Sequence, residues 1–303
     1  MRRVLPLILF AVAACGDASG PDIETPRTVL FYREDTGENF LINSDGSAGH
    51  VLDFTDHALI PVGISTNGDR VAFLNGSALV TGAVSSSGRL DTVLNPVPQR
   101  MSLVSFSNDD RYIALYQYLP TPLLLVVDLA GGVDTLRPAA PPPVLPPVFS
   151  PSGDRIALVS ATQLSIQLTV VERDNEAIAP TAKIGFSLFL YRPVFGWPRW
   201  TAEGLLLATV HAGTDWDTLT VLAVNPDQPP DLAVQVLKVA SPILTWDAAS
   251  TYALAADGRA VVVAAVPPVR GGRELYYGSP RAARLTSLLN DPAALPAFPL
   301  ILP

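Results

Sequence analysis

The chain has 303 residues, of which 49% are hydrophobic and only 16% are charged, and its formal net charge is −8. This length and apolar content are sufficient for the core of one large domain. The acidic balance, with lysine only at Lys183 and Lys238, argues against nucleic-acid binding, which requires clustered basic residues. The single cysteine, Cys15, rules out an intrachain disulfide and a zinc site built from cysteine pairs.

The first residues have the pattern of an export signal. Arg2 and Arg3 precede the apolar run Val4–Ala14, whose 11 residues are too few to span a bilayer but are typical of the core of a signal peptide. We find no other apolar run of spanning length that is free of prolines and charges. We therefore expect the protein to be exported.

The end of this run resembles a bacterial lipobox. In Val12-Ala13-Ala14-Cys15, small residues precede a cysteine of the kind that is lipidated and becomes the new N-terminus. The alternative is an ordinary signal peptide followed by a chance cysteine. We predict residues 1–14 as a cleaved lipoprotein signal peptide and Cys15 as the lipidated residue. Residues 15–27, which are small, polar and proline-containing, are expected to form a flexible tether to the membrane.

One pattern of a turn and a strand occurs five times in the rest of the chain. Its clearest copy is Phe149-Ser150-Pro151-Ser152-Gly153-Asp154-Arg155-Ile156-Ala157-Leu158. Here Pro151 and Gly153 suit a tight turn, and the apolar run that follows is typical of a buried strand. The copies are 64–73, 106–115, 149–158, 200–209 and 254–263, and their fifth residues are 42, 43, 51 and 54 positions apart. Such a period, with short strands, predicts the four-stranded blades of a β-propeller.

The two ends of the chain are predicted to share one blade. Residues 29–33, 39–43 and 50–54 supply three strands with no inner strand before them, whereas the apolar run Leu295–Leu302 ends the chain with no strands after it. Pairing of this run with residues 29–33 would close the ring and remove exposed sheet edges. Pro296 and Pro299 count against a regular strand there, because proline lacks a donor for the ladder.

Residues 28–303 are therefore predicted as an all-β domain, a six-bladed β-propeller of four-stranded antiparallel blades. The proline-rich segment 138–147 is interpreted as a stiff connector between two blades, with a polyproline ligand as the alternative. Around 186–200 and 243–252 the chain carries additional apolar and aromatic residues, so longer loops are expected there.

The pattern Phe-Ser-Pro-Ser-Gly-Asp-Arg-Ile-Ala at 149–157, together with Leu41–Ser47, resembles the WD-like repeat of TolB-type β-propellers. The resemblance extends over residues 28–303. It implies a six-bladed propeller that faces the periplasm or the cell exterior and acts as a docking surface for other envelope proteins. It implies no particular catalytic residue.

A search for catalytic motifs finds none. The chain has no Gly-x-Ser-x-Gly elbow, no phosphate-binding Gly-Lys-Ser/Thr and no dinucleotide fingerprint. Its histidines are His50, His57 and His211. The segment His211–Asp217 could offer an imidazole and two carboxylates to a cation, but this composition is ordinary for an exposed loop. We predict no catalytic residue, no metal site and no cofactor.

Binding residues are instead expected on one face of the ring. The loops that lead into the inner strands and the loops between the second and third strands of each blade share this face. Arginine and aromatic residues commonly anchor protein interfaces. The candidates on this face are His57, Arg100, Gln117, Tyr118, Arg192, His211, Trp216 and Arg270.

The sequence thus favours a non-catalytic, membrane-anchored lipoprotein of the bacterial cell envelope. We expect a monomer that binds another envelope protein, a glycan or a peptide. One alternative is a propeller enzyme, a lyase or hydrolase acting on glycans at the channel mouth, and another is a sensor of a small ligand or sugar. A channel lined by Asp, Glu, His or Tyr would favour the enzyme, whereas an apolar or aromatic rim would favour docking.

Overall fold

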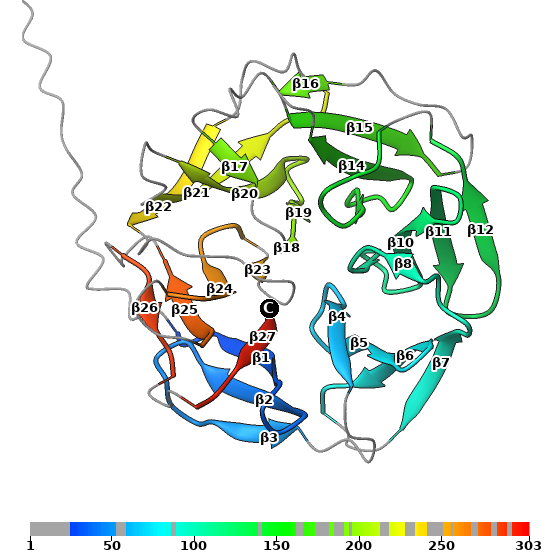
Figure 1. Ribbon diagram of the computed structural model, residues 1–303. Helices are drawn as coiled ribbons and strands as arrows, with labels where there is room; N and C mark the ends of the chain where they lie inside the picture. Colours follow the sequence, from blue (N-terminus) through cyan, green and yellow to red (C-terminus); the bar gives the residue numbers. More distant parts are fainter. Residues whose placement is uncertain are drawn as a thin grey trace, which may run out of the picture.

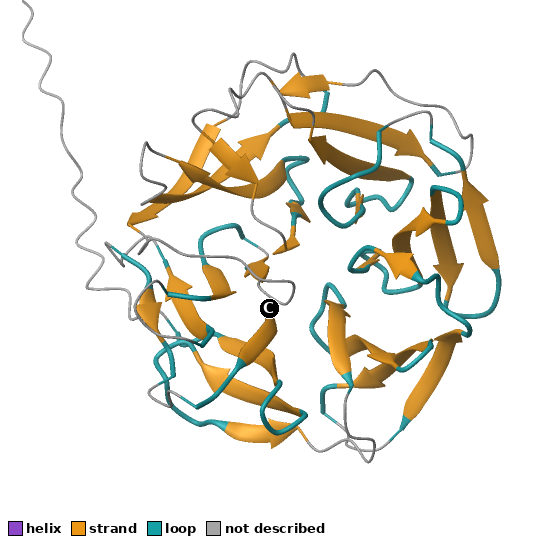
Figure 2. Ribbon diagram, viewed as in Figure 1, coloured by secondary structure: helices purple, strands orange, loops and turns teal. Residues whose placement is uncertain are grey.

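The computed structural model describes residues 25–52, 59–85, 89–138, 141–161, 166–173, 182–184, 191–193, 196–212, 218–227, 234–240, 251–255, 257–267, 272–279, 284–289 and 293–302. Within these ranges no residue is helical. Six small antiparallel sheets are arranged around a common centre (Figure 1), and loops connect them at both ends (Figure 2). The predicted six-bladed β-propeller is confirmed.

The first three blades follow the N-terminal half of the chain. The first blade contains β27 (Pro296–Ile301), β1 (Thr28–Arg33), β2 (Glu38–Asn43) and β3 (His50–Leu52). The second contains β4 (Ile60–Ile64), β5 (Arg70–Asn75), β6 (Ala78–Ala83) and β7 (Leu90–Leu94). In the third, β8 (Arg100–Met101) and β9 (Ser105–Phe106) both pair with β10 (Tyr112–Leu119), which is followed by β11 (Leu123–Asp128) and β12 (Val133–Leu136).

The other three blades complete the ring. The fourth contains β13 (Val148–Phe149), β14 (Arg155–Ala161), β15 (Ile166–Glu172) and β16 (Ala182–Ile184). In the fifth, β17 (Tyr191–Pro193) and β19 (Arg199–Trp200) both pair with β20 (Leu206–Ala212), followed by β21 (Thr218–Val224) and β22 (Val234–Ala240). The sixth contains β23 (Thr251–Leu254), β24 (Val261–Ala265), β25 (Glu274–Gly278) and β26 (Thr286–Ser287), and β18 (Gly196–Trp197) runs parallel to β23.

The repeated motif forms the turn between the inner strand and the second strand of a blade. In the fourth blade, Gly153 adopts a φ of +76°, and its amide donates to the carbonyl of Ser150. The hydroxyl of Ser150 accepts a hydrogen bond from the amide of Arg155 at 3.0 Å. Ser65 and Ser107 bind Arg70 and Tyr112 in the same way. The serine of the motif therefore satisfies the first amide of the second strand, which explains its recurrence.

The ring closes as the sequence predicts. In the first blade β27 pairs with β1, and Leu302 donates its amide to the carbonyl of Thr28 at 2.9 Å. The register shifts between Leu30 and Tyr32, so that Phe298 and Pro299 lie opposite the single Phe31. Pro299, which has no amide hydrogen, is thus accommodated at a bulge.

The core lies between neighbouring blades. Phe106 of the third blade packs with Val62 and Leu79 of the second, and Phe149 of the fourth packs with Tyr116 of the third. Trp200 of the fifth packs with Val148 of the fourth. In these three copies the aromatic residue that begins the repeat therefore joins its blade to the previous one.

A candidate binding cavity at the channel mouth

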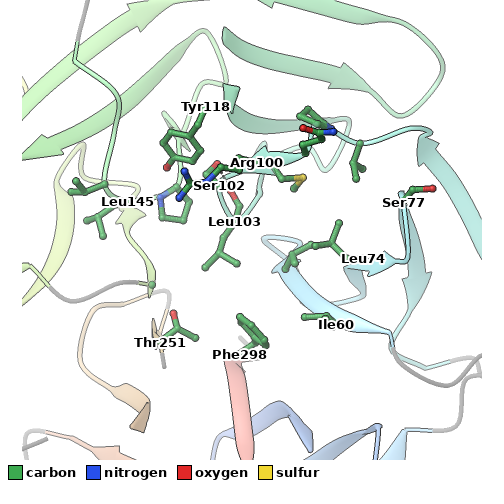
Figure 3. A pocket seen from close by; sticks show the side chains of 18 of the residues that line it. Ile60, Leu74, Ser77, Arg100, Ser102, Leu103, Tyr118, Leu145, Thr251 and Phe298 are labelled. Carbon is green, nitrogen blue, oxygen red and sulfur yellow. Dashed lines mark hydrogen bonds between the residues drawn. The ribbon is translucent and has the colours of Figure 1, made fainter. Parts of the chain in front are cut away.

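The structure contains a cavity of about 990 Å³ at the centre of the ring, on the face where the inner strands begin. The first, second, third and sixth blades and the segment that leads into the fourth contribute to its wall. It is lined by Ile60, Val62, Leu74, Gly76 and Ser77 from the second blade, 97–103 and Tyr118 from the third, 144–146 leading into the fourth, Gly196, Thr251 of the sixth and Phe298 of the first. Figure 3 shows the lining side chains around the open space and labels ten of them.

The wall is mostly apolar. Ile60, Leu74, Leu103, Leu145 and Phe298 surround the space from the first three blades and the segment that leads into the fourth (Figure 3). Among the residues described here, the lining contains no Asp, Glu or His. An apolar cavity with few polar groups is typical of binding sites, since apolar burial supplies affinity and the polar groups fix orientation.

Tyr118 is held in place by the proline-rich connector. Its hydroxyl donates to the carbonyl of Pro143 at 3.0 Å, and burial raises the pKa of the phenol. The same connector accepts a hydrogen bond from Ser160 at Pro141, and the amide of Val144 donates to Val159. The described part of segment 138–147 is therefore packed as a connector, as the sequence indicates. With its hydroxyl already donated and its pKa raised, Tyr118 is suited to contact and not to proton abstraction.

Arg100 is the cation at the rim. Its side chain is exposed, and in the described chain no carboxylate lies within ion-pair distance of it. In the ladder Arg100 lies opposite Leu119, whose side chain is 45% exposed. Gln117 donates from its side-chain amide to the carbonyl of Thr121 at 2.9 Å and so fixes the loop that carries Leu119. The rim thus presents a charge and a large apolar side chain next to each other.

Trp197 is buried next to Gly196, which lines the cavity. Strand β18 lies along β23, and the buried Trp197 indole donates to the carbonyls of Val62, at 3.1 Å, and Val104, at 3.2 Å. The amide of Val104 also donates to Val62 at 2.8 Å. A Cβ on Gly63 would lie 2.5 Å from Val104, so glycine is needed for this close approach. The inner strands of the second and third blades and the inserted β18 therefore form one hydrogen-bonded unit.

The predicted binding residues have different outcomes. Arg100 and Tyr118 line the cavity, and Gln117 supports its rim. The backbones of Arg192 and His211 are direct partners in the β17–β20 ladder. His57, Trp216, Arg270 and the lipidation residue Cys15 lie outside the described residues.

Sequence reasoning missed Leu103, Leu119 and Phe298. They belong to segments that lead into or out of inner strands, but their apolar side chains looked like ordinary core. No group of three or more metal-binding side chains occurs among the described residues. In the same part of the chain, no helix has the length and hydropathy required to cross a bilayer.

Comparison with known proteins shows which solved structures share this fold. No protein-family model matches the sequence, and no curated protein matches it. Among solved structures, TolB from Acinetobacter baumannii superposes with a TM-score of 0.63 at 11% identity, covering 91% of this chain and 67% of that one. A candidate TolB from Agrobacterium tumefaciens gives 0.57 at 9% identity over 92% of this chain and 99% of its own. A chain of a nidogen–laminin complex gives 0.59 at 10% identity over 91% and 98%.

The molecule is a β-propeller with a central cavity open at one face. Its fold is that of the TolB-type six-bladed propellers.

Proposed function

We propose that this protein is a non-catalytic docking propeller of the bacterial cell envelope, anchored to a membrane through a lipid on Cys15. The observation that carries the proposal is the apolar cavity with Arg100 and Leu119 at its rim. A partner that inserts an apolar side chain would bury it in the cavity, and a neighbouring carboxylate would pair with Arg100. Large apolar anchors beside arginine are typical of the residues that contribute most to protein interfaces.

Two further points support docking over catalysis. The described lining offers no carboxylate or imidazole that could act as a general acid or base, which a glycan lyase or hydrolase would require. The structural neighbours include TolB and a propeller determined as part of a nidogen–laminin complex. Both are consistent with a propeller that binds proteins.

A small-ligand sensor is the second candidate. The cavity volume of about 990 Å³ lies at the upper end of the range of roughly 300–1,000 Å³ that small-molecule sites occupy. A sensor would bury its ligand in the cavity and would leave Leu119 at the rim without a protein partner.

Photo-crosslinking in intact cells tests the docking proposal. A photoreactive amino acid at Leu119 is expected to yield a defined protein adduct, whereas the same amino acid at the exposed Asp69, on the opposite face, is not. Arg100→Glu should reduce the Leu119 adduct, and the matched control Arg89→Glu, at an exposed position away from the cavity, should not. Absence of an adduct, or equal yields at Leu119 and Asp69, would contradict docking at this face.

The anchor is tested in the same cells. Cys15→Ser is expected to move the protein from the membrane fraction to the soluble fraction, because a single-residue change removes every acyl chain. Retention in the membrane fraction would refute lipidation at Cys15 and leave the docking result unaffected.

A further inference from the structure

Arg199 lies on an inner strand of the fifth blade, at a position that carries no charge in the other four copies of the repeat. It belongs to β19, which Figure 1 shows beside β18 at the inner end of this blade. Its neighbour Trp200 packs toward the fourth blade, whereas the Arg199 Nε donates toward the sixth, to the carbonyl of Leu254 at 3.3 Å. The side chain is half-buried and so keeps contact with solvent.

The internal repeats show that the fold does not need a cation at this position. Arg199 precedes the first residue of its repeat, and the equivalent residues of the other four copies are Gly63, Ser105, Val148 and Ala253. All four pair with the second strand of their own blades, as Arg199 pairs with Leu207. Each is small or apolar. The arginine is therefore a feature of the fifth blade alone.

The charge of Arg199 is not balanced within the described part of the chain. No carboxylate there forms an ion pair with it, and its one hydrogen bond is the contact from Nε to Leu254. Burial lowers the pKa of Arg199, because the surroundings disfavour the charged form. Partly desolvated charges are normally paired, since removing a charge from water is costly.

The free part of the guanidinium has the chemistry of an oxyanion site. With Nε bonded to Leu254, the two terminal nitrogens retain four N–H donors in one plane. This arrangement matches two oxygens of a carboxylate, sulfate or phosphate. We propose that Arg199 binds a small oxyanion in the interior of the propeller, separate from the cavity lined by Arg100. This site is independent of the docking function.

The response of thermal stability to anions tests the proposal. The purified protein is melted in sodium chloride, acetate, sulfate and phosphate at matched pH and ionic strength, over a series of concentrations. At least one oxyanion is expected to raise the Tm of the wild type in a saturable manner, because a ligand that binds only the folded state stabilises it. Arg199→Gln should lose the saturable part and keep only the general salt effect.

Arg89→Gln is the matched control. It removes the same charge at a side chain that is 88% exposed and paired only with surface Asp91, so it should retain the saturable response. A wild type without a saturable response to any of the oxyanions would overturn the proposal, whatever the variants do. An identical response in Arg199→Gln would also overturn it.

A second variant tests whether Arg199→Gln loses the response only because it misfolds. Arg199→Met keeps the length and apolar stem of the side chain while removing a charge that has no ion-pair partner among the described residues. In chloride its Tm is expected to equal or exceed that of the wild type, and added oxyanion should not raise it saturably. A clear fall in Tm in chloride would show that the cation has a partner within the chain, which would refute the proposal.

Discussion

Asp110 occupies the turn position that glycine occupies in the other four repeats, with a φ of +54°. Its carboxylate accepts a hydrogen bond from the amide of Thr66 in the neighbouring blade at 2.9 Å. Desolvation is the largest effect on this group and raises its pKa, despite the hydrogen bonds from Thr66 and Asn67. One residue thus replaces the glycine of the turn and links two blades.

This residue predicts a pH-dependent effect of Asp110→Asn. A raised pKa in the folded state means that the carboxyl group favours folding most at low pH, and that this contribution is lost as the pH rises through the folded-state pKa. Asparagine keeps the acceptor oxygen and tolerates a positive φ. We expect the variant to be more stable than the wild type at pH 7, by about 0.5 kcal/mol.

Thermal melts between pH 4 and pH 8 are the measurement, with Asp109→Asn as the comparison. The pKa of Asp109 is lowered, first of all by a hydrogen bond from Ser107, so its neutralisation should destabilise the fold at pH 7. The advantage of Asp110→Asn should shrink toward pH 4. An advantage that grows on acidification would contradict the assignment.

At the scale of the strand, β18 joins three blades through one indole. Trp197 and Trp200 are both buried, and only two residues separate them. Trp197 donates to two carbonyls, whereas the buried Nε1 of Trp200 has no hydrogen-bond partner among the described residues. A comparison of the two residues can therefore distinguish the contribution of the indole hydrogen bonds to stability from the contribution of side-chain packing.

Replacement of each tryptophan by phenylalanine is expected to have unequal costs. Both substitutions remove similar volume, but only Trp197→Phe removes hydrogen bonds, each worth about 0.5–1.5 kcal/mol. Chemical denaturation should show the larger loss of unfolding free energy for Trp197→Phe. Equal losses, or a larger loss for Trp200→Phe, would show that the indole bridge contributes little to stability.

The sequence predicted the repeated elements better than the exceptional ones. The turns and second strands could be located because the same backbone hydrogen bond closes the turn in all five copies, and a serine hydroxyl binds the first amide of the second strand in three of them. The sequence predicts longer loops around 186–200, but the described parts of this segment form three short strands on two blades. No local pattern could reveal this, since the pairing of Gly196 with Tyr252 depends on the approach of another blade.

The candidate site was predictable only for its polar members. Arg100 and Tyr118 were found because loop position and residue type both pointed to the binding face. Phe298 was missed because its direction depends on the bulge opposite Phe31 and on its positive φ of 49°. These features arise from the pairing of the two chain ends, so they become visible only in three dimensions.

For the whole molecule, stability is expected to depend on ring closure. Strand β27 is the inner strand of the first blade and packs against strands of the second and sixth blades through Leu300 and Ile301, both 1% exposed. Removal of residues 295–303 would leave the edge of β1 unpaired and expose this core.

Deletion of residues 295–303 should therefore lower the Tm sharply. A milder test is Leu300→Ala, for which a loss of about 2–5 kcal/mol is typical of a buried leucine. Val133→Ala, at a side chain 46% exposed on an outer strand, should change stability by no more than about 0.5 kcal/mol. Differential scanning calorimetry gives both quantities, and an unchanged Tm after the deletion would contradict closure as a source of stability.

The chain enters the propeller on the side opposite the cavity. Thr28 accepts the hydrogen bond from Leu302 at the turn end of the inner strands, and Arg27 pairs at 2.7 Å with Asp257 in the turn of the sixth blade. A lipid on Cys15 would therefore be tethered to the turn face of the propeller. The cavity, with Arg100 and Leu119, would then lie on the face opposite this attachment, where the tether would not obstruct a partner.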